Sequence, residues 1–226
     1  MTKMRSYNAF EDEQLAKRYE NYYETKYKRT DLLEKELLTE LFAKLPISKT
    51  VLEIGCGTGH FTNWMQSKLK LQAIGLDSSK PMITEAKHTA SQTVLIQGHG
   101  EKLPLITKAV DIAAFITSLE FMTKPTEALK EAARVAKAGL ILGLINKASP
   151  DALRKTFKAK IQQNSIYSQA KFYSISDIKK LLENALKEGY EIVYWKTTVF
   201  SKLLSKIEPS GLPFGAFLGV AIKLKG

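Results

Sequence analysis

The chain has 226 residues and a hydrophobic content of 44%, which suits one domain with a full hydrophobic core over residues 1–226. No apolar run reaches the ~18 residues of a membrane span, and the N-terminal stretch lacks the apolar centre of a signal peptide. The single cysteine, Cys56, excludes an intramolecular disulfide framework. We therefore expect a cytoplasmic protein without a membrane span.

The net charge of +11 is concentrated in the last third of the chain, because residues 150–226 carry 13 basic and 6 acidic groups. Such an excess is compatible with nucleic acid, a membrane surface or an anionic substrate as the partner. The alternative is that the charge only keeps the protein soluble.

The first 45 residues are predicted to form a helical cap. Apolar residues recur at helical spacing near residues 10–19 and again over 30–45, where Thr30 or Asp31 could cap the helix and Pro46 stops it. Four tyrosines fall between these helices: Tyr19, Tyr22, Tyr23 and Tyr27. They either pack the cap onto the core or form a lid that contacts cofactor and substrate.

The organising motif follows the cap. An apolar run from Val51 to Ile54 predicts a buried strand, three glycines follow at alternate positions, and a helical pattern begins at Thr58. Strand, glycine turn and helix together are typical of a nucleotide-type cofactor site. A dinucleotide fingerprint would require a third glycine at position 60, where His60 stands, so the spacing argues against NAD.

A second expected strand, 71–76, ends at Asp77, about 20 residues after the glycine turn. A carboxylate at that place can accept both hydroxyls of a bound ribose.

Helices and strands alternate from residue 50 to residue 145, which predicts a doubly wound parallel sheet. Ser78 or Ser79 is expected to cap one helix, and another is expected over 125–137. Two final strands have no helix between them, so we expect an antiparallel pair at the sheet edge. The further strands are expected at 93–97, 109–116, 139–145, 191–199 and 214–224.

Residues 146–175 interrupt this alternation with a basic insert, after which Ser176 is expected to cap a helix. Between Arg154 and Lys171 the insert has five basic residues and no acidic one. We predict a substrate lid in which Arg154, Lys155 and Lys158 favour an anionic acceptor; the alternative is a solvated helix face.

The segments VLEIGCGTGHFT, IGLDSSKPMI, QGHGEKLPL and AVDIAAFITSLEFM resemble the type 11 group of class I S-adenosylmethionine (SAM) methyltransferases, which are small bacterial and archaeal enzymes. The resemblance implies a Rossmann-like, seven-stranded, mostly parallel sheet with a final antiparallel strand and helices on both faces. It also implies SAM as the cofactor and S-adenosylhomocysteine as the product.

The same resemblance implies roles for individual residues. The methionine part of SAM would lie against the glycine loop, and its ribose would lie on Asp77. Its adenine would lie between the segment after Asp77 and the loop after the third strand. Thr117 and Ser118 would lie beside the transferred methyl group. His99 stands where the family usually has an acidic residue. The cofactor-binding residues would be Glu53, Gly55, Cys56, Gly57, Gly59, Asp77, Ser78, Met82, His99, Gly100, Glu101 and Thr117.

Motifs that the chain lacks reduce the range of possible methyl acceptors. The Asn/Asp-Pro-Pro-aromatic motif of base-amino methyltransferases is missing after the fourth strand, and the only cysteine lies in the glycine loop. The three histidines are too scattered to suggest a metal site, so no metal is expected. Glu120 is a candidate base, although a salt bridge would also explain it. We predict a small-molecule acceptor near Tyr19, Tyr22, Tyr23 and Ser118; an RNA methyltransferase or a non-catalytic SAM-binding regulatory protein is the alternative.

Overall fold

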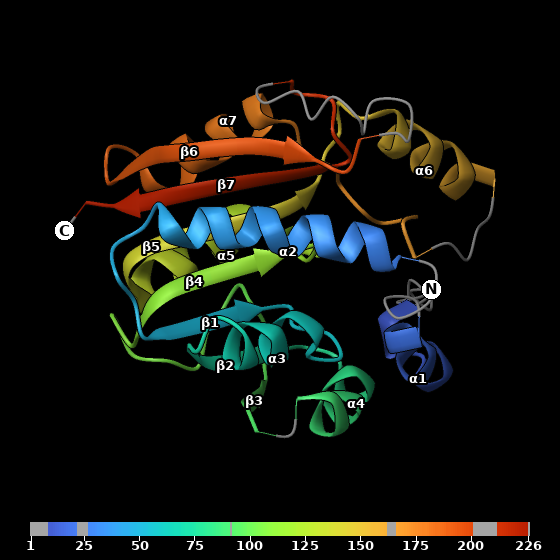
Figure 1. Ribbon diagram of the computed structural model, residues 1–226, viewed down its shortest axis with the longest axis horizontal. Helices are drawn as coiled ribbons and strands as arrows, with labels where there is room; N and C mark the ends of the chain where they lie inside the picture. Colours follow the sequence, from blue (N-terminus) through green and yellow to red (C-terminus); the bar gives the residue numbers. More distant parts are fainter. Residues whose placement is uncertain (1–8, 22–26, 91, 162–165, 201–211, 226) are drawn as a thin grey trace, which may run out of the picture.

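The computed structural model describes residues 9–21, 27–90, 92–161, 166–200 and 212–225. Their seven strands form one sheet in the order β3-β2-β1-β4-β5-β7-β6 (Figure 1). No helix within these ranges is long and apolar enough to cross a membrane. The strands are β1 (Thr50–Ile54), β2 (Gln72–Asp77), β3 (Val94–Gln97), β4 (Val110–Ile116), β5 (Ala136–Ile145), β6 (Tyr190–Thr198) and β7 (Phe217–Leu224).

The first five strands run parallel, and β7 runs antiparallel to both of its neighbours, β5 and β6. This confirms the predicted mostly parallel sheet with a closing antiparallel pair. The strand order reverses between β1 and β4, so a crevice forms beyond the carboxyl ends of these two strands.

Helices cover both faces of the sheet, and each face has its own core. Leu38 and Leu41 of α2 pack with Phe61 of α3 against one face, whereas Leu129 of α5 and Ile178 of α7 pack against the other. The remaining helix of the sheet, α4, contacts β2 and β3. The bounds are α2 Lys28–Ala43, α3 His60–Ser67, α4 Lys80–Thr89, α5 Pro125–Val135 and α7 Ile175–Leu186.

The N-terminal cap consists of the short helix η1 (Ala9–Glu11) and α1 (Glu13–Asn21), and both contact α4. Asp12 caps α1 by accepting hydrogen bonds from the backbone of Gln14 (2.8 Å) and Leu15 (3.2 Å). The Ser79 hydroxyl donates to the carbonyl of Phe10 (2.7 Å), so the cap is tied to the start of α4. Of the cap predicted over residues 1–45, η1 and α1 contact α4, whereas the second predicted helix, α2, packs against the sheet.

Several predicted helix starts were wrong by one or two residues. The helix predicted from Thr30 begins at Lys28, and the Asp31 side chain contacts Lys35 and His60 instead of capping it. The helix after the glycine loop begins at His60 rather than Thr58. Ser174, not Ser176, caps α7, because its hydroxyl accepts from the Asp177 backbone. Of the two candidates for the N-cap of α4, the structure selects Ser79.

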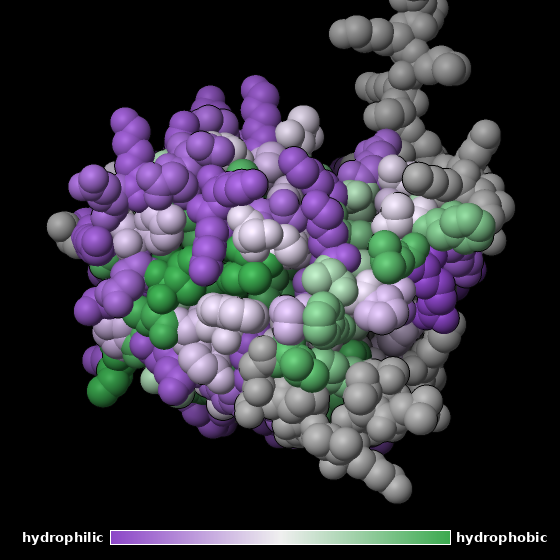
Figure 2. All heavy atoms as spheres, turned by 90° about the horizontal axis from the view of Figure 1, so that it is seen from above, coloured by the Kyte–Doolittle hydropathy of each residue, from purple (hydrophilic) through white to green (hydrophobic). Residues whose placement is uncertain are grey.

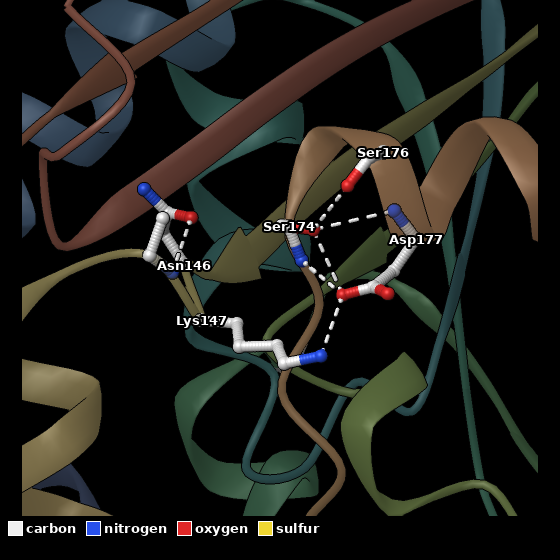
Figure 3. A network of polar contacts seen from close by, with 6 residues as sticks. Asn146, Lys147, Ser174, Ser176 and Asp177 are labelled. Atoms are coloured by element: carbon white, nitrogen blue, oxygen red, sulfur yellow. Dashed lines mark hydrogen bonds and ion pairs between the residues drawn. The ribbon is translucent and has the colours of Figure 1, made fainter.

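The two ends of the insert lie side by side, one directly after β5 and the other at the start of α7 (Figure 3). Lys147 at its first end forms an ion pair with Asp177 in the first turn of α7 (Nζ to Oδ2, 3.1 Å). The Lys147 backbone also donates to the carbonyl of Tyr173 (3.0 Å), and Asn146 donates to the carbonyls of Pro213 and Gly215. Both ends of the insert are thereby fixed, and α6 (Pro150–Ile161) lies between them.

Candidate active site

A cavity of about 350 Å³ lies at the carboxyl ends of β1, β2 and β4. Its floor is the glycine loop after β1, and its far walls come from the N-terminal cap and from residues 166–169 of the insert. Nearly all of the residues that the sequence predicts to bind the cofactor line this cavity, from Glu53 on β1 to Thr117 after β4; Gly59 lies just behind them.

The glycine loop has a backbone that side chains would not allow. Gly55, Gly57 and Gly59 have φ values of +78°, +54° and +81°, which are left-handed. A Cβ on Gly59 would lie 2.7 Å from the Cβ of Ala90, whereas a Cβ on Gly57 would meet nothing within 4 Å. Gly57 therefore leaves space for a ligand. Gly59 makes no side-chain cap bond to α3, so the first N–H groups of that helix can bind an anionic group.

Asp77 joins the glycine loop to the next turn. Its Oδ2 accepts a hydrogen bond from the Gly57 backbone (2.8 Å), and its Oδ1 accepts one from the Ser79 backbone (2.8 Å). Burial raises the pKa of this carboxyl, and the two backbone N–H groups oppose that shift. Each oxygen keeps a second acceptor site, so Asp77 can also hold two hydroxyl groups of a ligand in the cavity.

Glu53 is a carboxyl with 1% of its surface exposed, and the Thr62 hydroxyl donates a hydrogen bond to its Oε2. Burial raises its pKa to about 8, and nearby Asp77 adds to the rise, although Thr62 and His60 oppose it. A cationic ligand beside Glu53 would recover part of this cost by favouring the ionised form. SAM carries such a positive charge, so the residues present fit it.

The predicted adenine wall is formed by Ser78, Met82 and the loop after β3. Gly100 must be glycine there, because a Cβ would lie 2.7 Å from the Cγ2 atom of Ile54. Glu101 accepts backbone hydrogen bonds from Thr123 (3.1 Å) and Lys124 (3.3 Å), so its carboxylate already positions the loop that precedes α5. Cys56 also lines the cavity, and burial raises the pKa of its thiol.

The loop after β4 forms the wall next to the predicted methyl acceptor. Thr117 has a φ of +48°, and its backbone donates to the carbonyl of Gly143 (2.7 Å). The Ser118 hydroxyl donates to the carbonyl of Ile54 (2.6 Å), which fixes this loop against β1. Both residues line the cavity.

Glu120, the candidate base, lies in the short helix η3 (Leu119–Phe121), and it is not among the described residues that line the cavity. Its Oε1 accepts a hydrogen bond from the Ile145 backbone (2.6 Å), and its carbonyl accepts one from Lys171 (2.8 Å). Burial raises the pKa of its carboxyl to about 7. This geometry favours a role in fixing the loop to β5 and to the insert.

Two aromatic rings, Phe10 and Phe121, line the cavity where the N-terminal cap meets η3. Phe10 of the cap and Phe121 of η3 meet edge to face, with centroids 4.9 Å apart, and Tyr167 of the insert stacks beside Phe121 at 6.5 Å. Tyr19 also lines the cavity, as do Ile166, Ser168 and Gln169. Tyr22 and Tyr23 lie outside the described residues.

The predicted cations of the insert are elsewhere. Arg154 and Lys155 both form ion pairs with Asp151 (3.0 and 2.9 Å), and neither they nor the exposed Lys158 line the cavity. The Nζ of Lys155 lies 5.2 Å from the centre of the Tyr167 ring. The predicted basic segment begins at Arg154. It therefore leaves out Asp151, the acidic partner that lies three residues before it.

The outer surface of α6 mixes charged and apolar side chains. Arg154 is exposed, and so are Leu153 and Phe157 on the same helix. Figure 2 shows this mixture in its right half, where α6 lies, whereas hydrophilic side chains dominate the upper left. The described part of α6 thus directs most of its charge to the outside.

Sequence reasoning missed His60. It is the first residue of α3, lines the cavity, and contacts Asp31 and Lys35 of α2. Asp31 and His60 are 29 positions apart in the chain, and no local pattern connects them.

The comparisons with known proteins match this geometry. A family model described as "Methyltransferase domain" matches residues 52–143, which include the glycine loop, Asp77 and the loop after β4. A SAM-dependent methyltransferase of Thermotoga maritima, described as a possible histamine N-methyltransferase, has 28% identity and a TM-score of 0.72 over 95% of this chain and 98% of its own.

Two sequence relatives add to this. An uncharacterised protein of Methanocaldococcus jannaschii is 28% identical over 209 residues, which are 90% of this chain and 96% of that protein. A malonyl-[acyl-carrier protein] O-methyltransferase of Buchnera aphidicola is 34% identical over 131 residues, and the match spans only about half of that protein's length (52%). The cavity, the matched domain and these relatives together support a class I SAM-dependent methyltransferase that is similar to the type 11 group.

Proposed function

We propose that this enzyme methylates a small molecule that enters the cavity between the N-terminal cap and the insert. The cavity volume of about 350 Å³ carries the proposal, since it is near the lower end of the ~300–1,000 Å³ typical of small-ligand sites. SAM supplies a methyl group on a sulfur that is already a good leaving group. The protein's contribution is therefore to bind and orient, and to remove a proton where the acceptor has one.

The residues of the cradle would hold SAM by its different parts. We assign the methionine part to the glycine loop and the N-terminus of α3, and the ribose to Asp77, because these groups offer backbone N–H donors and carboxylate acceptors in one cavity. Met82 and Gly100 offer an apolar, closely packed slot for the adenine. The His99 contact with adenine stays a prediction.

The charge of the cavity favours a neutral or amine acceptor over an anionic one. None of the described lining residues is a lysine or an arginine, whereas Glu53, Asp77 and Glu101 are all acidic. The cations that suggested an anionic acceptor, Arg154 and Lys155, are paired with Asp151 outside the cavity. An anionic acceptor would thus find no lysine or arginine among the described lining residues to offset its charge.

The names of the relatives are compatible with more than one acceptor atom. The name of the Thermotoga maritima protein gives an amine as the possible acceptor. The name of the Buchnera aphidicola protein gives an oxygen of a malonyl group on a carrier protein. The cofactor half of the site is common to such enzymes, so the acceptor must be sought in the walls formed by the cap, η3 and the insert.

An RNA acceptor is the rival, and the net charge of +11 is the observation that favours it. The test offers methyl-labelled SAM with a low-molecular-weight cell extract in one reaction and total RNA in another. We expect label in the extract and none in the RNA, with no transfer by Asp77→Ala. Label in RNA that falls steeply with added salt would overturn the proposal. Binding of S-adenosylhomocysteine without transfer to either pool would favour the non-catalytic alternative.

A further inference from the structure

We propose that the Thr117 hydroxyl binds the methyl acceptor by accepting a hydrogen bond from an N–H or O–H group of that molecule. The inference rests on the proposed function, because it names the chemical class of the acceptor in the same cavity: an amine or a hydroxyl compound. Thr117 follows β4 directly and lines the cavity. Its backbone conformation, its accessibility and the hydrogen bonds around it support this role.

The backbone of Thr117 is strained. Its φ of +48° is left-handed, and a β-branched residue with such a φ is an outlier, because the Cβ crowds its own backbone. The other described non-glycine residues with a positive φ, which are Lys70, Lys108, Lys187 and Val199, are not among those that line the cavity. Strained residues cluster at ligand clamps, where the surrounding structure holds a needed side chain in place.

The surroundings of Thr117 hold this conformation. Its backbone N–H donates to the carbonyl of Gly143 on β5 (2.7 Å), and the hydroxyl of Ser118 donates to the carbonyl of Ile54 (2.6 Å). Gly55 permits this close approach, because a Cβ there would lie 2.5 Å from the Cβ of Ser118. Thr117 is therefore fixed next to the glycine loop, to which the proposed function assigns the methionine part of SAM.

The hydroxyl of Thr117 is available to a ligand. Residues 112–116 and 118–120 are all buried, whereas Thr117 is half-buried and lines the cavity. The Ser118 hydroxyl already donates to Ile54, but the Thr117 hydroxyl makes no hydrogen bond to another residue that the structure describes. A hydroxyl has one donor hydrogen and two acceptor lone pairs, so that of Thr117 can accept from an N–H or O–H group in the cavity.

The strand order separates Thr117 from the groups that we assign to the ribose and the adenine. β2 and β3 lie on one side of β1, and β4 lies on the other, so Asp77 is across the glycine loop from Thr117. The short helix η3 follows on the Thr117 side, where it contacts β5. Its Phe121 ring lines the cavity and meets that of Phe10 at 4.9 Å. The acceptor therefore combines a polar N–H or O–H group with an apolar part that suits these rings.

The hydrogen bond orients the acceptor for transfer. A bond forms between the acceptor nitrogen or oxygen and the methyl carbon while the carbon–sulfur bond breaks, and the sulfur keeps that electron pair. Because the hydrogen of the acceptor atom is held by Oγ1 of Thr117, a lone pair of the same atom is left to face the methyl group. The acceptor then loses its proton to water, and Thr117 keeps its own.

The first test measures the strain and needs no acceptor. Lys108 is the matched control: it stands at the other end of β4 with a φ of +56°, it is exposed, and its N–H donates to the carbonyl of Arg134 (2.9 Å). Glycine removes the left-handed cost at either position, so Thr117→Gly and Lys108→Gly should each raise Tm by about 2–4 °C. A Tm that rises in Lys108→Gly and falls in Thr117→Gly would overturn the inference.

The second test measures labelling of the low-molecular-weight fraction at limiting acceptor and saturating labelled SAM, which compares kcat/KM for the acceptor. Thr117→Val keeps the branched shape without the hydroxyl and should lower this rate roughly 3- to 10-fold, as for the loss of one hydrogen bond. Thr117→Ser keeps the hydroxyl and should stay within about twofold of the wild type. Thr117→Gly should lose at least as much as Thr117→Val despite its higher Tm, and Lys108→Gly should lose nothing. The Kd of S-adenosylhomocysteine should stay within about twofold in all four variants.

Each other outcome has a separate meaning. If the wild-type protein labels the fraction and Thr117→Val does so at the same rate, the role of the hydroxyl is wrong and the proposed function stands. If Thr117→Val weakens S-adenosylhomocysteine binding as much as it slows labelling, Thr117 is a cofactor ligand and the inference fails. A product with the new methyl group on carbon would also overturn it. If the wild-type protein labels nothing, the proposed function fails and the inference fails with it.

Discussion

The two walls of the cavity are built in different ways. The cofactor cradle comes from β1, the glycine loop and the end of β2, and its decisive groups are backbone N–H donors, left-handed glycines and one carboxylate. The proposed acceptor wall comes from η1, α1, η3 and the insert, and its decisive groups are side chains that meet from distant parts of the chain, such as Phe10 with Phe121.

This difference has a physical consequence. A backbone cradle fixes its donors within a few residues, so the same short motif can bind the same cofactor in many enzymes. In a wall built from side chains, single residues can be substituted without altering the backbone of β1 or of the glycine loop. The acceptor can therefore differ between relatives while the cofactor does not.

The largest expected effect is on stability, and it should differ between two glycines of the cradle, Gly59 and Gly57. Gly59→Ala should lower the free energy of unfolding by about 2–5 kcal/mol, because a left-handed alanine costs ~1–2 kcal/mol and its Cβ would lie 2.7 Å from that of Ala90. Gly57→Ala should lose only the ~1–2 kcal/mol of the left-handed backbone, since its Cβ would meet nothing within 4 Å. Urea unfolding measures both. Equal losses would mean that the contact with Ala90 is relieved by a shift of α4.

The next effect concerns the cofactor. Asp77→Ala should raise the Kd of S-adenosylhomocysteine by roughly 10- to 100-fold, or about 1.5–3 kcal/mol for hydrogen bonds to a charged group. Calorimetry is the measurement. Asp111→Ala is the matched control, because Asp111 also accepts two backbone hydrogen bonds, from Lys49 and Thr50, at the opposite end of the strands. A folded Asp77→Ala protein with wild-type affinity would end the ribose assignment.

The third effect is a pH dependence of stability that arises in the cradle. The pKa of Glu53 rises from 4.5 to about 8 on burial, so between these values the folded protein holds a proton that the unfolded chain has released. The free energy of unfolding should therefore fall as the pH rises through this window, by about 1 kcal/mol per unit from this group.

Glu53→Gln should remove that part of the slope, as measured by urea unfolding at about pH 5.5 and about pH 7.5, two points inside the window. Glu34 and Glu120 have raised pKa values of about 8 and about 7, so a smaller slope of the same sign should remain. Identical slopes in the variant and the wild-type protein would show that the Glu53 carboxyl titrates near its ordinary pKa.

The cradle and the fold were predictable because their signals are local. Buried parallel strands leave continuous apolar runs, and the glycines recur at a spacing that only their left-handed backbone explains. Even here the helix starts were wrong by one or two residues. At α2 the N-cap position is Tyr27, which makes no side-chain cap hydrogen bond, so this position gave no local signal for the start at Lys28.

The acceptor wall was not predictable to the same extent. Whether Arg154 and Lys155 face a substrate depends on where α6 lies and on Asp151, which precedes the basic run by three residues. In the sequence His60 only interrupts a dinucleotide motif, because its partner Asp31 belongs to a helix whose position depends on the packing of Leu38 and Leu41 against the sheet. Such contacts are tertiary and leave no periodic pattern.

The smallest effect tests whether the cations of α6 hold the insert in place or bind the acceptor. Lys155 is 24% exposed, pairs with Asp151 and lies near the Tyr167 ring, so Lys155→Gln should cost about 1 kcal/mol of stability. Arg154 pairs with the same carboxylate but is 81% exposed, so Arg154→Gln should cost less than about 0.5 kcal/mol. Thermal unfolding of the two single variants makes the comparison.

The acceptor KM completes this test. The double variant Arg154→Gln, Lys158→Gln should keep the wild-type KM for the labelled acceptor, because neither side chain lines the cavity. Lys155→Gln should change KM only as far as Tyr167 moves the Phe121 ring, which does line it. A severalfold rise of KM in the double variant, with unchanged affinity for S-adenosylhomocysteine, would mean that α6 closes over an anionic acceptor during catalysis. The acceptor specificity would then come from the charge of the insert rather than from the rings and the Thr117 hydroxyl inside the cavity.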